Sequence, residues 1–144
     1  MAFQLRIVPE QRCIVYRIGA DYRTDDCLAA WKSMGDQPGY APDFNIVTDL
    51  RDVRSFEADY QQLTQLAPNL AHVHKQMPAS VNHVILTERD VQFGVARMYQ
   101  QVVENTVKFN VYATRELCCA ATIVSVPEDT LSAILDTIKV SREV

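Results

Sequence analysis

Two short apolar runs most constrain the fold of this chain. Ile46, Val47 and Leu50 form the first run, and residues 84–86 (Val-Ile-Leu) form the second. Runs this short, without polar alternation, are typical of strands that are buried on both faces of a sheet. A helical pattern follows each run, so the sequence predicts parallel strands that are joined by helices.

The other periodic stretches complete an alternating order of strands and helices. Residues 3–7 and 12–19 alternate around a tight turn, which predicts an antiparallel hairpin. Further strands are expected at 43–50, 81–87 and 107–113, the last near a sheet edge, with 123–126 as a final strand or a connector. Helices are expected at 24–36, 55–77, 90–106, 114–121 and 127–138, with Pro68 kinking the second or dividing it. The predicted fold is α/β: an open, mostly parallel sheet with an N-terminal antiparallel hairpin and helices on the sheet faces.

Length and composition indicate one domain over residues 1–144. Apolar residues make up 48% of the chain and charged residues 22%, which is usual for a globular protein. The net charge is −4 and Lys and Arg form no run, which argues against nucleic acid and anionic membranes as partners. No apolar stretch approaches the roughly 20 residues that span a bilayer. We therefore expect a protein without a membrane span.

The chain contains four cysteines, at positions 13, 27, 118 and 119. Cys118 and Cys119 are adjacent, and the geometry of a disulfide makes neighbours poor partners. We expect the reduced thiols of a cytoplasmic protein, which serve mostly as small core residues. Only Cys118, near Arg115, has the cationic neighbour that a reactive thiol needs.

Charged residues are concentrated directly after the first apolar run. Asp49, Arg51 and Asp52 lie within four residues of each other, at the expected carboxyl end of a strand, where open α/β sheets usually bind ligands. These side chains could bind a polar ligand or act as an acid/base pair. Alternatively, Asp49 accepts backbone N–H groups of the next turn and the charges pair locally. Together with Ser55, the expected N-cap of the second helix, they form a candidate recognition edge.

The third helix carries a second candidate surface. Phe93 is expected to project away from the sheet, with Arg97 one turn later, so that the guanidinium stacks on the ring. Phe93 is then either a single exposed aromatic residue or the centre of a self-association or partner surface. The opposite, packing face is expected to comprise Val91, Val95, Met98, Tyr99, Val102 and Thr106.

The sequence offers no support for a metal site or an enzyme. His72 and His74 are two residues apart on a helix and point to different faces, and His83 stands alone in a strand. A zinc site needs three or four converging ligands. The chain has no nucleophile elbow, Walker A or dinucleotide-binding motif. We therefore expect a non-enzymatic protein that uses no cofactor.

Two motifs resemble those of a known family. Residues 48–53 (T-D-L-R-D-V) end a strand, and residues 93–99 (F-G-V-A-R-M-Y) lie in the third helix. With the hairpin and the element order, they resemble the SpoIIAA-like branch of STAS/SEC14-type bacterial proteins over nearly the whole chain. In the wider STAS group, a phosphorylatable Ser lies in an Asp-Ser-Ser-Gly turn. Here that place holds residues 54–57 (R-S-F-E), without the glycine or the second serine, so Ser55 is expected to cap the helix.

The resemblance implies a STAS-like regulatory or protein-interaction domain, and the third helix suggests a homodimer or a protein partner. The SEC14 side of the resemblance implies an alternative, a carrier of a lipid or another small apolar ligand. A third possibility, from the residues themselves, is an enzyme that uses Asp49 or Asp52.

Overall fold

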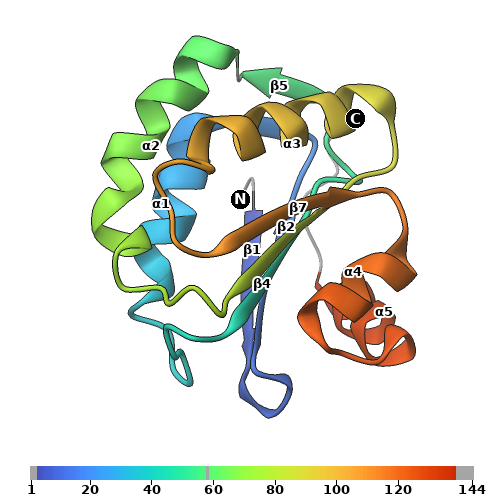
Figure 1. Cartoon of the computed structure of the whole chain (residues 1–144). Helices are drawn as coiled ribbons and strands as arrows, with labels where there is room; N and C mark the ends of the chain where they lie inside the picture. Colours follow the sequence, from blue (N-terminus) through green and yellow to red (C-terminus); the bar gives the residue numbers. More distant parts are fainter. Residues whose placement is uncertain (1–2, 58, 139–144) are drawn as a thin grey trace.

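The computed structural model describes residues 3–57 and 59–138 and is centred on a five-stranded sheet (Figure 1). The strands lie in the order β1-β2-β4-β6-β7. Their bounds are Phe3–Val8 for β1, Cys13–Ile18 for β2, Asn45–Asp49 for β4, Asn82–Leu86 for β6 and Asn110–Thr114 for β7. A 3-10 turn, η1 (Pro9–Gln11), joins β1 to its antiparallel neighbour β2, and the other neighbours are parallel. The predicted α/β fold, hairpin, central strand and edge strand are confirmed.

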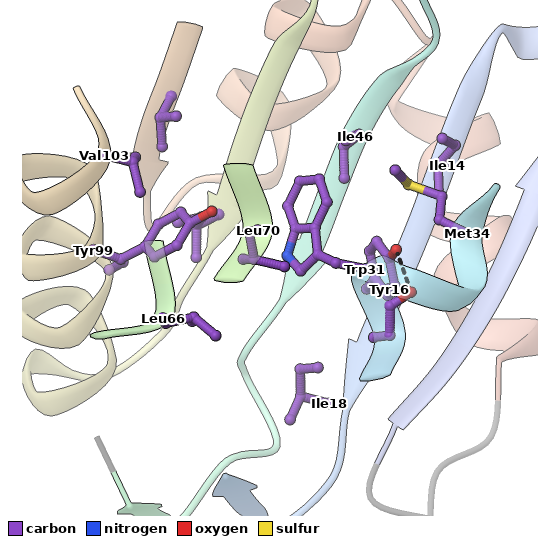
Figure 2. Packing of buried hydrophobic residues seen from close by; sticks show 14 of the residues in the cluster. Ile14, Tyr16, Ile18, Trp31, Met34, Ile46, Leu66, Leu70, Tyr99 and Val103 are labelled. Carbon is purple, nitrogen blue, oxygen red and sulfur yellow. Dashed lines mark hydrogen bonds between the residues drawn. The ribbon is translucent and has the colours of Figure 1, made fainter. Parts of the chain in front are cut away.

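Three helices cover one face of this sheet (Figure 1). They are α1 (Thr24–Met34), α2 (Tyr60–His74) and α3 (Asp90–Val103). Each lies in a connection that steps in the same direction along the strand order. Because parallel crossovers are right-handed, steps in one direction place every connecting helix on the same face. The larger hydrophobic core lies beneath them and includes Trp31, Leu70 and Tyr99 (Figure 2).

Two short helices, α4 (Leu117–Val124) and α5 (Glu128–Thr137), cover the opposite face (Figure 1). The core there joins Val15, Val47 and Val84 of the sheet to Leu131 and Leu135 of α5. The interpretation of residues 123–126 as a strand or connector is wrong for its first half, because α4 extends to residue 124. Side-chain amides at the starts of two strands bind the last carbonyls of α4: Asn45 donates to Val124 at 3.2 Å and Asn82 to Ile123 at 3.0 Å.

The second helix begins later than the sequence indicates, so the prediction that Ser55 caps it is wrong. Ser55 lies in β5 (Ser55–Glu57), which pairs with β3 (Asp21–Arg23) as a separate parallel sheet. Its hydroxyl donates to the Asp21 carboxylate. The N-cap is Asp59, whose carboxylate accepts from the Gln62 N–H while the Gln62 side chain accepts from the Asp59 N–H, each at 2.8 Å. From this capping box α2 runs through Pro68 as one helix.

The packing face of α3 also differs from the prediction. Its buried residues are Gln92, Ala96, Tyr99 and Val103, whereas Val91 is 54% exposed. Apolar periodicity favours Val91 over Gln92 for the interior. The structure reverses this choice because the Gln92 amide finds hydrogen-bond partners for both its donor and its acceptor, which removes the penalty for burying it.

Candidate functional site

The charged residues at the end of β4 are bound to each other. Asp49 is 1% exposed, and its carboxylate accepts from the Arg51 backbone N–H at 3.0 Å. The Arg51 side chain forms a two-pronged pair with the same carboxylate, Nε to Oδ1 and Nη2 to Oδ2, both at 3.0 Å. Hydrogen bonding to Asp49 raises the pKa of Arg51. The local pairing that the sequence allowed as an alternative is therefore present.

Arg17 of β2 extends this arrangement across the sheet. Its guanidinium contacts the Asp52 carboxylate at 2.9 Å, and it donates to the carbonyls of Leu135 and Ile138 at 2.7 and 2.9 Å. We call Arg17, Asp49, Arg51 and Asp52 the strand-end cluster. The cluster ties β2 and β4 to the end of α5, so a structural role accounts for its charges.

Gln92 of α3 fills the space beside the strand-end cluster. Its Nε2 donates to the carbonyls of Arg51 and Val53 at 3.1 and 2.9 Å. Its Oε1 accepts from the backbone N–H groups of Glu88 and Arg89 at 2.8 and 3.0 Å. Ligand crevices of open α/β sheets form where the strand order reverses, and the order here advances without reversal. The topology thus removes the reason to expect a crevice at this end.

The candidate residues are only partly brought together. Asp49, Arg51 and Asp52 form one cluster, but Ser55 belongs to the small β3–β5 sheet. On α3, the expected stack of Arg97 on Phe93 is replaced. The guanidinium of Arg115, from the loop after β7, lies 4.9 Å from the Phe93 ring centroid, and Arg97 donates to Gln100 at 2.7 Å. Periodicity within one helix could not reveal a partner that comes from a later loop.

A pocket between the sheet and the first three helices was missed by the sequence reasoning. We call it the aromatic pocket, and its walls include Tyr16, Tyr22, Trp31, Thr48, His83 and Tyr99. Its volume is about 40 Å³. Figure 2 shows Trp31 entering this interior from α1 and Tyr99 from α3, with the Tyr99 hydroxyl pointing inward. The rings of Trp31 and His83 meet edge to face, with centroids 5.5 Å apart.

Some polar atoms in and beside this pocket have no hydrogen-bond partner in residues 3–57 and 59–138. His83 Nε2 shares a hydrogen bond of 2.8 Å with the Thr48 hydroxyl. Among the described residues, His83 Nδ1, the Tyr99 hydroxyl and His74 Nε2 are buried without a hydrogen-bond partner. Most buried polar atoms in proteins have one, so these three require an explanation.

Both buried histidines are neutral at physiological pH. Burial lowers the pKa of His74 to about 4 and that of His83 to about 3, where His74 adds a smaller effect. His72, by contrast, is exposed, so the prediction that His72 and His74 face different ways is confirmed. The sequence signal for the pocket was weak: a lone histidine directly before the apolar run at 84–86.

Two properties of the described chain narrow the range of sites. Within residues 3–57 and 59–138, no three His, Cys, Asp or Glu side chains form a group that could hold a metal ion. In the same ranges, no single helix is long and apolar enough to cross a membrane.

Comparison with protein-family models finds no match to this chain, and comparison with curated proteins finds none either. The resemblance to the SpoIIAA-like branch therefore stays a prediction, which the α/β fold accommodates.

The first prediction concerns the strand-end cluster. We expect Asp49→Asn to lower the free energy of unfolding by about 2 kcal/mol, because it removes the charge from a buried, two-pronged pair. The matched control is Asp43→Asn, whose exposed partner is Arg12; such pairs contribute about 0–1 kcal/mol. Urea unfolding measures both variants. Equal stability of Asp49→Asn and the parent protein would show that the cluster is not structural.

The second prediction concerns acid. The pKa values of His74 and His83 are lower in the folded protein than the 6.5 of a free histidine, so the unfolded chain binds more protons as the pH falls. Stability should therefore fall below pH 6.5, by about 2 kcal/mol per histidine at pH 5. His74→Phe should reduce this slope by one proton, because phenylalanine does not titrate. Urea unfolding of the parent protein and this variant at pH 7, 6 and 5, followed by Trp31 fluorescence, tests the prediction; equal slopes would contradict the assignment.

Proposed function

We propose that this protein is a non-enzymatic domain that binds a small uncharged ligand in the aromatic pocket. One observation carries the proposal: His83 and Tyr99 line the pocket, and among the described residues His83 Nδ1 and the Tyr99 hydroxyl are buried without a hydrogen-bond partner. A mostly apolar pocket with a few converging polar groups is the usual form of a small-molecule site. A bound polar group would satisfy both atoms, whose burial is otherwise unfavourable.

The chemistry of the pocket selects an uncharged group. His83 is neutral, and no charged side chain belongs to the pocket walls in the described residues, so an ion would lose its hydration without compensation. A ligand hydroxyl suits the site because it can both donate and accept a hydrogen bond. The Tyr99 hydroxyl has the same two capacities, so the two groups can pair. The expected ligand is therefore a small alcohol or phenol.

The volume limits how much of the ligand can be buried. About 40 Å³ exceeds the roughly 10–15 Å³ that a cavity needs to hold one water molecule, but a cavity that holds benzene measures about 150 Å³. Only the hydroxyl end of a ligand fits without movement of the walls. A lipid chain would require a much larger opening, so the carrier interpretation is narrowed to small ligands.

The strand-end cluster supports the non-enzymatic part of the proposal. A general base needs a carboxylate that can reach a substrate proton. Asp49 is instead covered, and both its oxygens accept from Arg51. Asp52 contacts Arg17, which also holds the end of α5. Neither carboxylate offers the free, converging geometry that acid/base chemistry requires.

The third prediction tests the pocket with 4-fluorophenol and, as its matched probe, fluorobenzene, which lacks the hydroxyl. Fluorine NMR should show that 4-fluorophenol binds about tenfold more tightly, since one buried hydrogen bond contributes about 1 kcal/mol or more. Tyr99→Phe should remove this preference. It should not destabilise the free protein, because the deleted hydroxyl has no hydrogen-bond partner in the part of the chain that the structure describes.

Equal binding of the two probes, or none, would count against the proposal. A large loss of stability in Tyr99→Phe would show that the hydroxyl has a structural role instead. Native mass spectrometry of the purified protein, compared with the denatured mass, provides a second measurement: a small adduct that denaturation releases supports the proposal directly.

A second candidate function is self-association through α3, and the geometry of its exposed face favours it. Asp90 and Arg97 lie at equal distances in sequence from the Phe93–Gly94 bond, and both are exposed. A two-fold axis at that bond would place each Asp90 opposite the partner's Arg97. Apart from the neighbouring helix backbone, no atom of the described residues lies within 4 Å of the place where a Gly94 side chain would start, so a second backbone could approach closely there. Val91, 54% exposed, adds apolar area nearby.

The fourth prediction addresses this surface. The double change Phe93→Asp with Arg97→Glu should convert a dimer into a monomer, because it places like charges across the two-fold axis. Tyr60→Asp is the control, since Tyr60 is 62% exposed on α2. Light scattering coupled to size exclusion reports the mass. A monomeric parent protein, or a double variant of unchanged mass, would exclude this surface as a dimer contact.

A further inference from the structure

The two adjacent cysteines do not lie in the core, contrary to the expectation for the four thiols. Cys118 and Cys119 are both exposed and free, in the first turn of α4. The residues that pack α4 on the sheet are Ala120, Ala121 and Val124. The thiols therefore project into solvent, and neither contributes to the core that holds the helix in place.

The two thiols are close enough to act together. Successive side chains of a helix diverge by about 100°, so contact between neighbours is not automatic. Here both thiols are exposed on consecutive residues, whose Cα atoms are about 3.8 Å apart, so rotation about their side-chain bonds can bring both sulfurs to one acceptor atom. The neighbouring Cys119 thiol raises the pKa of Cys118, so this pair differs from the low-pKa thiolate of a reactive cysteine.

We propose that Cys118 and Cys119 form a chelating site for trivalent arsenic compounds. Trivalent arsenic is thiophilic and binds two thiols at once, leaving its third position for a group that the protein does not supply. Soft thiolate ligands favour such soft acceptors. With phenylarsonous acid, two As–S bonds replace two As–O bonds. The two thiol protons leave in two water molecules, and arsenic remains trivalent.

The other thiols cannot provide this site. Cys13 is fully buried in the α4–α5 core, and burial raises its pKa to about 12. Cys27 lines the aromatic pocket on the opposite face of the sheet, where burial raises its pKa to about 11. The proposed arsenic site is therefore independent of the aromatic pocket, and either could exist without the other.

The test is a titration of the reduced protein with phenylarsonous acid, followed by native mass spectrometry. The parent protein should hold one arsenical in the presence of excess 2-mercaptoethanol and release it to dithiothreitol, because only a dithiol can match a chelate. Cys118→Ser and Cys119→Ser should each weaken binding by about 100-fold or more. Each variant keeps only one thiol, so it loses the second As–S bond, which forms at a high effective concentration in the parent protein. Thr122→Ala, an exposed change on the same helix, should bind like the parent protein.

Release of the arsenical to 2-mercaptoethanol would overturn the proposal, because it would show a single As–S bond. Parent-like affinity in either serine variant would overturn it as well, since another thiol would then be responsible. Circular dichroism verifies that both serine variants keep their helices, which their exposed positions lead us to expect.

Discussion

The single direction in which the strand order advances is the constraint on which the rest of this structure depends. Right-handed crossovers then stack three helices on one face of the sheet and leave the other to the two helices after the last strand. This arrangement removes the crevice that a reversal of strand order would open at the strand ends. It also concentrates the large side chains under three helices, so that the aromatic pocket lies inside the main core.

That interior contains buried polar groups as well as apolar ones, and the buried polar groups differ in how completely they are hydrogen-bonded. Gln92 is fully buried, and both ends of its amide are bound to loop backbone, so it locks α3 to the end of β4. His83 has a partner for one nitrogen only, and the Tyr99 hydroxyl has none among the described residues. A satisfied buried amide is structural, whereas incompletely satisfied groups beside a cavity are what a ligand site requires.

The strand-end cluster shows how a charged motif can be prominent in sequence and yet serve the fold. Asp49, Arg51 and Asp52 were recognisable because charge follows a buried strand abruptly. Only one of their two pairings could be inferred from the sequence. The Asp49–Arg51 pair is local and follows from a two-residue turn, but the contact of Asp52 with Arg17 spans thirty-five positions. Sequence reasoning can anticipate the first kind of pair and has no means of finding the second.

The same division separates what the sequence determined from what the tertiary structure decided. Apolar runs and periodicity determined the element order, the hairpin, the mostly parallel sheet and its central and edge strands, because these follow from local burial patterns. The start of α2 and the packing face of α3 depended on Asp59, Gln92 and their hydrogen-bond partners, so apolar periodicity misplaced both. The aromatic pocket joins Trp31, His83 and Tyr99 from three separate elements. Only the tertiary structure could bring them together, because each one, viewed in its own segment, is an ordinary core residue.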